Sequence, residues 1–121
     1  MASHNCDAII VCCIDFRFQK YIRDWTDKNL ADKTFDLMAY AGATKSLSIV
    51  LEEVGLSVNL HHIKEVVLIH HEECGAYGTE STLERHAEDL RKAKDAILSA
   101  YPDLEVQLYY LHLNGTFEPV V

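Results

Sequence analysis

Three chemically active side chains occupy alternate positions directly after an apolar run near the start of the chain. The stretch IIVCCIDFRF, residues 9–18, begins as a buried β-strand does and then carries Cys13, Asp15 and Arg17. Because alternate side chains of an extended segment point to the same side, these three are expected side by side. A carboxylate and a guanidinium placed in this way can form a charge-assisted, bidentate pair. Taken alone, such a pair is typical of an ordinary strand end.

A second apolar run ends in residues that commonly ligate metals. The stretch VVLIHHEECGAYG, residues 66–78, carries His71 and Cys74 at a spacing that lets both side chains face one ion from a tight turn. Two thiolates and one imidazole suit zinc, and catalytic zinc sites commonly use three protein ligands and leave a fourth position for water. If the two runs meet in space, Cys13, His71 and Cys74 are the predicted zinc ligands.

These side chains can meet only if the elements between them bring the two runs together. Strand-like patterns predict strands at residues 8–13, 34–40, 65–70 and 105–113, and apolar periodicity predicts helices at residues 18–30, 44–54 and 81–100. Strands that alternate with helices form right-handed crossovers and a mostly parallel sheet. The sequence therefore predicts an α/β fold, a single-domain open sheet over residues 1–121 with a four-stranded core of order 2-1-3-4 flanked by helices. In that order the first and third strands are neighbours, and the binding crevice lies at their carboxyl ends.

Local signals refine the boundaries of these elements. Gly55 is expected to end the second helix, and residues 55–64 are expected to form a loop or a short helix. Ser81 and Glu84 are spaced as a capping box at the start of the third helix. The Asn-Gly pair at residues 114–115 is a turn signal, after which a short tail is expected.

The other cysteine, histidine and acidic residues have simpler interpretations. Cysteine is among the most buried residue types, so Cys6 and Cys12 are interpreted as structural. A redox pair of Cys12 and Cys13 is disfavoured, because adjacent side chains in a strand point opposite ways. His70 is expected in the third strand with its side chain on the opposite side from His71. The remaining histidines are interpreted as packed or solvated and two glutamates as solvated turn residues: His61, His62, His86 and His112, and Glu72 and Glu73.

Composition limits the class of protein. The chain has 121 residues, of which 49% are hydrophobic, and this suits one soluble domain with a sizeable core. Its net charge of −8 argues against a nucleic-acid partner. No apolar run approaches the roughly 20 residues that cross a bilayer, so no membrane association is expected. The N-terminal stretch MASHNCDA lacks the pattern of an export signal, so a cytoplasmic protein is expected, with its four cysteines serving as ligands or buried thiols.

Taken together, the motifs resemble those of the β-class carbonic anhydrases. Residues 13–17 (CIDFR) match the family's C-x-D-x-R motif, and residues 71–75 (HEECG) match its H-x-x-C-G motif. Residues 41–42 are similar to the alanine-glycine turn that opens the helix after the second strand. Residues 109–120 (YYLHLNGTFEPV) are similar to the family's last strand and turn. The resemblance covers most of the chain, with the motifs in the right order.

The resemblance implies a zinc enzyme. It implies that Cys13, His71 and Cys74 bind the zinc ion. It also implies that Asp15 and Arg17 form a catalytic dyad beside the fourth ligand position. The implied reaction is the reversible hydration of CO2 to bicarbonate by zinc-bound hydroxide, which Asp15 orients while Arg17 holds Asp15. In some members of the family the aspartate itself binds the zinc and closes the site.

The resemblance also implies a substrate pocket and a partner subunit. The turn residues Ala41 and Gly42, together with Phe16, are expected to wall the pocket, which the family builds between subunits. A homodimer or larger homo-oligomer is therefore expected, and the second strand would otherwise be an unpaired sheet edge. Three positions depart from the family: Phe16 replaces a small serine, Ala43 an asparagine and His70 a glycine. Because the first strand is predicted to begin near residue 8, we do not expect the family's N-terminal helices, which embrace a partner subunit.

Two alternative functions remain open at this point. Hydrolysis of CS2 or COS needs the same nucleophile and differs only in the access route to the site. A catalytically silent relative would keep the zinc ligands without turnover.

Overall fold

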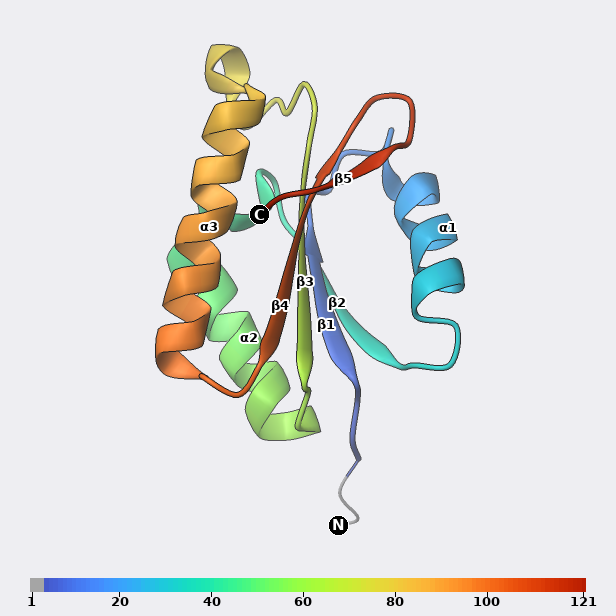
Figure 1. The fold of residues 1–121 in the computed structure, drawn as a ribbon, viewed down its shortest axis with the longest axis vertical. Coiled ribbons are helices and arrows are strands. Elements are labelled where there is room, and N and C mark those ends of the chain that lie inside the picture. The colour runs from blue at the N-terminus through green and yellow to red at the C-terminus, as the bar shows by residue number, and fades with distance from the viewer. Residues whose placement is uncertain (1–3) are drawn as a thin grey trace.

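The structure is a computed structural model that describes residues 4–121; residues 1–3, which belong to the N-terminal stretch expected to lack an export signal, lie outside the described part. The chain forms one open five-stranded sheet with helices on both faces (Figure 1). The strands are β1 (Ala8–Cys12), β2 (Phe35–Ala39), β3 (Glu65–His71), β4 (Glu105–Leu111) and β5 (Phe117–Pro119). The helices are α1 (Gln19–Asn29), α2 (Leu47–His61) and α3 (Leu83–Ala100), with two short 3-10 turns, η1 (Ala43–Lys45) and η2 (Gly78–Glu80).

The sheet has the order β2-β1-β3-β4-β5, in which the first four strands are parallel. This confirms the predicted α/β class and the predicted order 2-1-3-4. The expectation of a short tail after residue 115 is wrong, because β5 pairs antiparallel with β4. Gly115 has φ of 90° and donates its N–H to the carbonyl of His112, which reverses the chain. Phe117 then lies opposite Leu111 at the edge of the sheet.

Apolar side chains on both faces of the central strands form the core. In β1, Ile9 and Val11 pack with α2 and α3, whereas Ile10 and Cys12 pack with α1. Strands buried on both faces read as near-continuous apolar runs, which is the pattern that the sequence shows. Val11 pairs with Leu68 of β3, so the carboxyl ends of β1 and β3 emerge together.

The second helix is longer than the sequence predicts. The prediction ends it before Gly55, but α2 passes through Gly55 and continues to His61. Gly55 serves close packing, since a Cβ atom there would lie 2.8 Å from the hydroxyl oxygen of Tyr101. The helix ends at His62, which takes the left-handed conformation with φ of 57° and donates its N–H to the carbonyl of Val58.

The start of the third helix also differs from the prediction. Thr82 is the N-cap, and its hydroxyl accepts a hydrogen bond from the backbone N–H of Arg85. The hydroxyl of Ser81 instead accepts the backbone N–H of Cys74. The predicted capping box of Ser81 and Glu84 is therefore not the one that forms, because Ser81 is engaged by the turn after β3.

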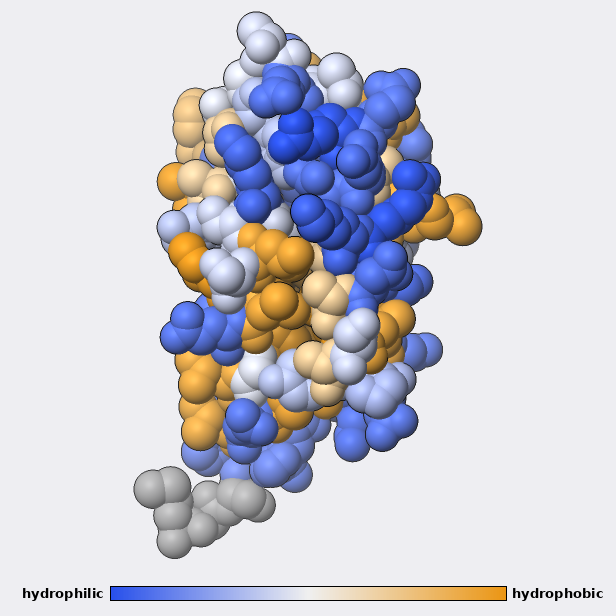
Figure 2. All heavy atoms as spheres, turned by 90° about the vertical axis from the view of Figure 1, so that its left-hand side faces the viewer, coloured by the Kyte–Doolittle hydropathy of each residue, from blue (hydrophilic) through white to orange (hydrophobic). Residues whose placement is uncertain are grey.

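The face that carries α2 and α3 is divided by polarity. Figure 2 shows hydrophilic side chains over its upper part and a larger share of apolar side chains lower down. On α2, Leu56 and Leu60 are exposed. Among residues 4–121, no helix combines the length and the apolar character needed to cross a membrane.

Candidate metal centre

Cys13, His71 and Cys74 converge where β1 and β3 end. Each residue offers one ligand atom, these atoms all lie within 4.8 Å of one another, and all three residues are buried. Cys13 directly follows β1, His71 is the last residue of β3, and Cys74 lies in the turn after it. Within the described part of the chain, this is the only cluster of potential ligands that could hold a metal ion.

The imidazole of His71 is oriented for ligation. Its Nδ1 lies 2.7 Å from the carbonyl oxygen of Glu72. A carbonyl can only accept, so Nδ1 carries the hydrogen and Nε2 of the neutral ring carries the lone pair. Phe18 stacks on this ring with 4.2 Å between ring centroids. Nε2 is buried without a hydrogen-bond partner in residues 4–121, which is the position expected of an atom that binds a metal.

The thiols of Cys13 and Cys74 lie side by side next to His71, with their sulfur atoms within 4.8 Å of each other. The neighbouring Cys74 thiol lowers the pKa of Cys13, against the opposing effect of burial. The backbone N–H of Gly42 also stabilises this thiolate, at 3.4 Å from Sγ. The neighbouring Cys13, together with burial, raises the pKa of the Cys74 thiol. A metal bound here after the thiols lose their protons would meet two thiolates and one imidazole nitrogen, and this donor set fits zinc.

Arg17 holds Asp15 at the edge of this cluster. Its Nε lies 3.1 Å from Oδ1 and its Nη2 lies 2.7 Å from Oδ2, and its backbone N–H also donates to Oδ1. These hydrogen bonds hold the pKa of Asp15 below its usual value, although partial burial opposes them. Oδ2 lies 3.8 Å from Nε2 of His71. The pair expected from the sequence is thus bidentate and lies directly beside the potential ligands.

Arg17 also joins the loop after β1 to the turn after β3. Its Nη2 donates to the carbonyl of Glu73 at 2.9 Å, and its Nη1 lies 3.3 Å from Glu73 Oε1. Glu73 has φ of 56°, an uncommon conformation for a residue other than glycine. The side chain of Glu73 is exposed, as expected, but its backbone carbonyl is part of the site.

Two residues that the motifs do not mark also support the site. Gln19 donates from Nε2 to the carbonyls of Cys13 and Asp15, each at 2.9 Å. Phe18 packs on His71 as described. Both residues lie at the start of α1, immediately after the first motif. That position, where a helix begins beside a polar loop, is the signal that could have indicated them.

A pocket of about 640 Å³ opens beside the cluster. Asp15 and Arg17 line one part of it, and the apolar side chains of Ile14, Phe16 and Ala41 line another. Phe16 is 87% exposed, so its ring stands at the mouth of the pocket. Two of the three expected wall residues, Phe16 and Ala41, therefore border this pocket.

The third expected wall residue, Gly42, lies behind Cys13 and not in the pocket lining. It has φ of 80°, and a Cβ atom there would lie 3.1 Å from the Cβ atoms of Ala76 and Lys45. Because its N–H approaches the Cys13 sulfur, a glycine at this position lets the backbone cradle a thiolate.

His70 and His86 form a buried pair on the side of β3 opposite to His71. Their Nδ1 atoms lie 2.7 Å apart, and the two rings are 1% and 0% exposed. Burial, reinforced by nearby histidines, lowers the pKa of His70 to about 3 and that of His86 to about 4. The interpretation of His86 as a packed histidine is correct for its burial but misses its hydrogen bonds.

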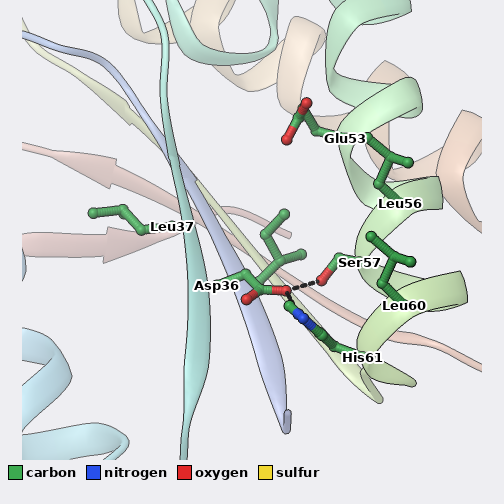
Figure 3. Close-up of a pocket in the computed structure, with 8 residues that line it drawn as sticks. Asp36, Leu37, Glu53, Leu56, Ser57, Leu60 and His61 are labelled. Carbon is green, nitrogen blue, oxygen red and sulfur yellow. Dashed lines mark hydrogen bonds and ion pairs between the residues drawn. The ribbon is translucent and has the colours of Figure 1, made fainter. Parts of the chain in front are cut away.

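A second pocket, of about 290 Å³, lies between β2 and α2, and its lining does not include Cys13, His71 or Cys74 (Figure 3). Asp36 points toward the helix, where its Oδ2 lies 2.6 Å from the Ser57 hydroxyl and 2.7 Å from Nδ1 of His61. Leu56 and Leu60 add apolar side chains to the lining. Because the three polar groups satisfy one another, they fasten α2 to the edge strand.

Solved structures that share this fold include several carbonic anhydrases. The carbonic anhydrase of Streptococcus mutans matches with a TM-score of 0.70 and 15% identity, over 98% of this chain and 84% of that one. The β-carbonic anhydrase isoform I of Trichomonas vaginalis matches with a TM-score of 0.68 and 12% identity, over 100% and 85%. The β-carbonic anhydrase CafA of Aspergillus fumigatus matches with a TM-score of 0.53 and 14% identity, over 96% and 76%. At these identities the likeness establishes the fold.

Sequence relatives and a family model place the chain more closely. A protein of Rickettsia bellii, described as uncharacterized, is 26% identical over 140 residues, covering 97% of this chain and 83% of its own length. An uncharacterized protein of Rickettsia conorii is 29% identical over 140 residues, covering 97% of this chain and 73% of its own length. The family model described as "Putative carbonic anhydrase" matches residues 3–121. From this match and the fold, we conclude that the chain belongs to that carbonic anhydrase family and has the β-carbonic anhydrase architecture.

Proposed function

We propose that the protein is a zinc-dependent enzyme that reversibly hydrates CO2 to bicarbonate. The observation that carries this proposal is the buried cluster of Cys13, His71 and Cys74, in which Nε2 of His71 has no hydrogen-bond partner among the described residues. Membership of a carbonic anhydrase family supports the same reaction. A zinc ion held by these residues supplies the Lewis acidity that activates a water molecule for addition to CO2.

Asp15 and Arg17 orient the attacking water in this proposal. The hydrogen bonds from Arg17 hold the pKa of Asp15 below its usual value, so the carboxylate is ionised at neutral pH and can only accept. A water that donates one hydrogen to Asp15 keeps a lone pair free for the carbon atom of the substrate. Arg17 also binds the carbonyl of Glu73, which fixes the carboxylate relative to the turn that carries Cys74. A positioned proton-handling group typically contributes about 10²- to 10⁴-fold to a rate.

The apolar part of the pocket suits a small gas molecule. The side chains of Ile14, Phe16 and Ala41 carry no hydrogen-bonding groups. They could contact CO2 without forming hydrogen bonds to it or to the attacking water. The same lining suits CS2 and COS, so hydrolysis of these gases is the second candidate function. The two candidates share the ligands and the dyad and differ only in the preferred substrate.

We also propose that the active form is a homodimer or a larger homo-oligomer. Strand β2 ends the sheet, and Phe35 and Leu37 are exposed on it. Long apolar edge strands are usually covered in native proteins, and a second copy of the chain would cover this one. The mouth of the pocket is also open beside the exposed side chains of Ile14 and Phe16, which a second subunit could enclose.

We further propose a cytoplasmic location. None of the four cysteines is paired in a disulfide, which is typical of proteins in a reducing compartment.

The test is a direct comparison of gases on zinc-loaded protein. We expect stopped-flow measurements to show CO2 hydration well above the uncatalysed rate, and we expect it to disappear after chelation and return with added zinc. Faster turnover of CS2 or COS than of CO2 would favour the second candidate. Full zinc occupancy with no turnover of any of the three gases would identify a silent relative and reject the proposed reaction.

A further inference from the structure

A chain of hydrogen bonds runs behind the turn that carries Cys74. Thr44 Oγ lies 2.6 Å from Nε2 of His70, and Nδ1 of His70 lies 2.7 Å from Nδ1 of His86. Nε2 of His86 lies 2.9 Å from Ser81 Oγ. The backbone N–H of Cys74 donates to the same oxygen at 2.9 Å. These hydrogen bonds connect η1, β3 and the start of α3 to the backbone of Cys74, a predicted metal ligand.

One backbone donor sets the direction of these hydrogen bonds. The N–H of Thr44 points at Nε2 of His70 at 3.3 Å, so this nitrogen accepts and Nδ1 of the neutral ring carries the hydrogen. The facing Nδ1 of His86 must then accept. His86 therefore carries its hydrogen on Nε2 and donates to Ser81. Ser81 Oγ accepts from His86 on one side and from Cys74 on the other.

The two histidines of this network are closed to solvent, whereas Ser81 is partly exposed. His70 and His86 are fully or almost fully buried, and the ring of Tyr77 packs against both, with centroids 5.7 Å and 4.3 Å away. The Tyr77 hydroxyl donates to Asp89 of α3 at 2.6 Å. Removal of one member would leave buried polar groups unsatisfied, and such groups are costly. The arrangement therefore specifies one position for the turn relative to α3.

The hydrogen bond to Ser81 holds Cys74, which directly follows the strained residue Glu73. Glu73 has φ of 56°, and the N–H of Cys74 that follows it is the group that Ser81 binds. A shift of this amide would move the Cys74 sulfur relative to the ligand atoms of Cys13 and His71, which now lie within 4.8 Å of it.

We propose that His86 is a positioning residue for the metal centre, which fixes the backbone of Cys74 through Ser81 and so keeps the three potential ligands together. The inference rests on the proposed zinc site. His86 contacts neither substrate nor metal in this role. Outer-shell partners of metal ligands typically contribute about 10- to 100-fold to metal affinity, and we expect a loss in this range for His86→Ala and for Ser81→Ala.

The experiment measures the affinity of the full chain for Zn²⁺ and Co²⁺ by competition with a chromophoric chelator. The cobalt absorption spectrum reports the ligand geometry directly. Ser81→Thr keeps the hydroxyl, and His86→Gln keeps an amide donor for Ser81, so both should retain more affinity than the alanine variants. Leu90→Ala is the matched control, because Leu90 is buried on the same helix but lies in the apolar cluster. It should lower the melting temperature without changing the cobalt spectrum.

Two results would overturn the inference. One is unchanged metal affinity and an unchanged cobalt spectrum in both His86→Ala and Ser81→Ala. The other is an equal loss of affinity in Leu90→Ala at matched stability, which would indicate general loosening of the fold.

A readout that needs no metal separates this inference from the proposed function. The amide resonance of Cys74, observed by NMR, should shift in His86→Ala as it does in Ser81→Ala and stay in place in Leu90→Ala. If the wild-type chain bound no zinc but these shifts occurred, the zinc enzyme would be rejected while the control of the Cys74 backbone by His86 would stand. If His86→Ala left this resonance unchanged, that control would be refuted whatever the metal result.

Discussion

His71 Nε2 lies 3.8 Å from Oδ2 of Asp15, although each of these side chains is already oriented by another group. The carbonyl of Glu72 fixes the imidazole, and the guanidinium of Arg17 fixes the carboxylate. The lone pair on Nε2 of His71 and Oδ2 of Asp15 therefore face the same small space, and neither atom forms a hydrogen bond with the other. This separates two roles that variants can test independently, ligation by His71 and proton handling by Asp15.

The ligand set predicts which substitutions release the metal. The purified protein should hold about one zinc ion per chain, and Cys13→Ser, His71→Ala and Cys74→Ser should each lose it, because a three-ligand site cannot spare a ligand. Cys6→Ser is the control, since Cys6 is half-buried and hydrogen bonds to the carbonyl of Ala8. Elemental analysis after gel filtration gives the occupancy. Full occupancy in Cys74→Ser would remove that residue from the site.

Substitution of Asp15 should uncouple catalysis from metal binding. Asp15→Asn keeps the shape of the side chain but removes the carboxylate that Arg17 holds, so CO2 hydration should fall by about 10² or more while zinc stays bound. Glu73→Gln is the control, because its exposed side chain changes charge next to Arg17 while its backbone carbonyl remains. Stopped-flow rates with parallel zinc analysis decide the matter. An Asp15→Asn enzyme at full speed would rule out the assigned role.

The edge strand predicts the effect of a charge on assembly. Leu37 is 59% exposed on β2, so Leu37→Asp should shift a dimer toward monomer by placing a charge in the interface. Leu83→Asp is the matched control, because Leu83 is also exposed but lies at the start of α3. Light scattering at micromolar concentration measures the mass. A wild-type monomer that hydrates CO2 would contradict the proposed assembly.

Acid should destabilise the fold through the buried histidine pair. Burial lowers the pKa of His86 from 6.5 to about 4, so the unfolded chain binds this proton first as the pH falls. The stabilising effect is complete above about pH 6.5 and is lost progressively between about pH 6.5 and pH 4. The free energy of unfolding of the metal-free protein, measured with urea across this range, should therefore fall more steeply than in His86→Gln.

A matched histidine substitution checks this assignment. His62→Asn removes an exposed histidine and keeps a residue that tolerates the left-handed conformation at the end of α2. Its pH dependence should follow that of the wild type. Parallel curves for the wild type and His86→Gln would show that His86 does not contribute.

Much of the fold could be predicted because the apolar patterns of the strands are strong. β1 and β3 are buried on both faces, and their near-continuous apolar runs gave the parallel order that the structure has. The end of α2 could not be predicted from Gly55, because that glycine makes room for Tyr101, a contact from a distant part of the chain. β5 was missed because a strand of three residues is too short to show a pattern.

The candidate site divides in the same way. The positions of Cys13, His71 and Cys74 follow from two strands that end side by side, so their convergence could be foreseen from topology. The motifs do not mark the supporting residues, because the side chains of Gln19 and Ser81 bind backbone groups. Only Gln19 has a sequence signal, its position at the start of a helix beside a polar loop. The roles of the three cluster residues as ligands, and of Gln19 and Ser81 as supporting residues, are predictions that the variants test.

Both segments that carry the potential ligands leave from interior strands. β1 lies between β2 and β3, and β3 lies between β1 and β4, so neither is an edge of the sheet. Local fraying of β2 or β5 would leave Cys13 and His71 in place, whereas separating them requires the most cooperative unit of the protein to open. Release of the metal should then require global unfolding and not local opening of an edge strand. A bound zinc ion would therefore stabilise the central strands, while β2 and β5 could still open locally.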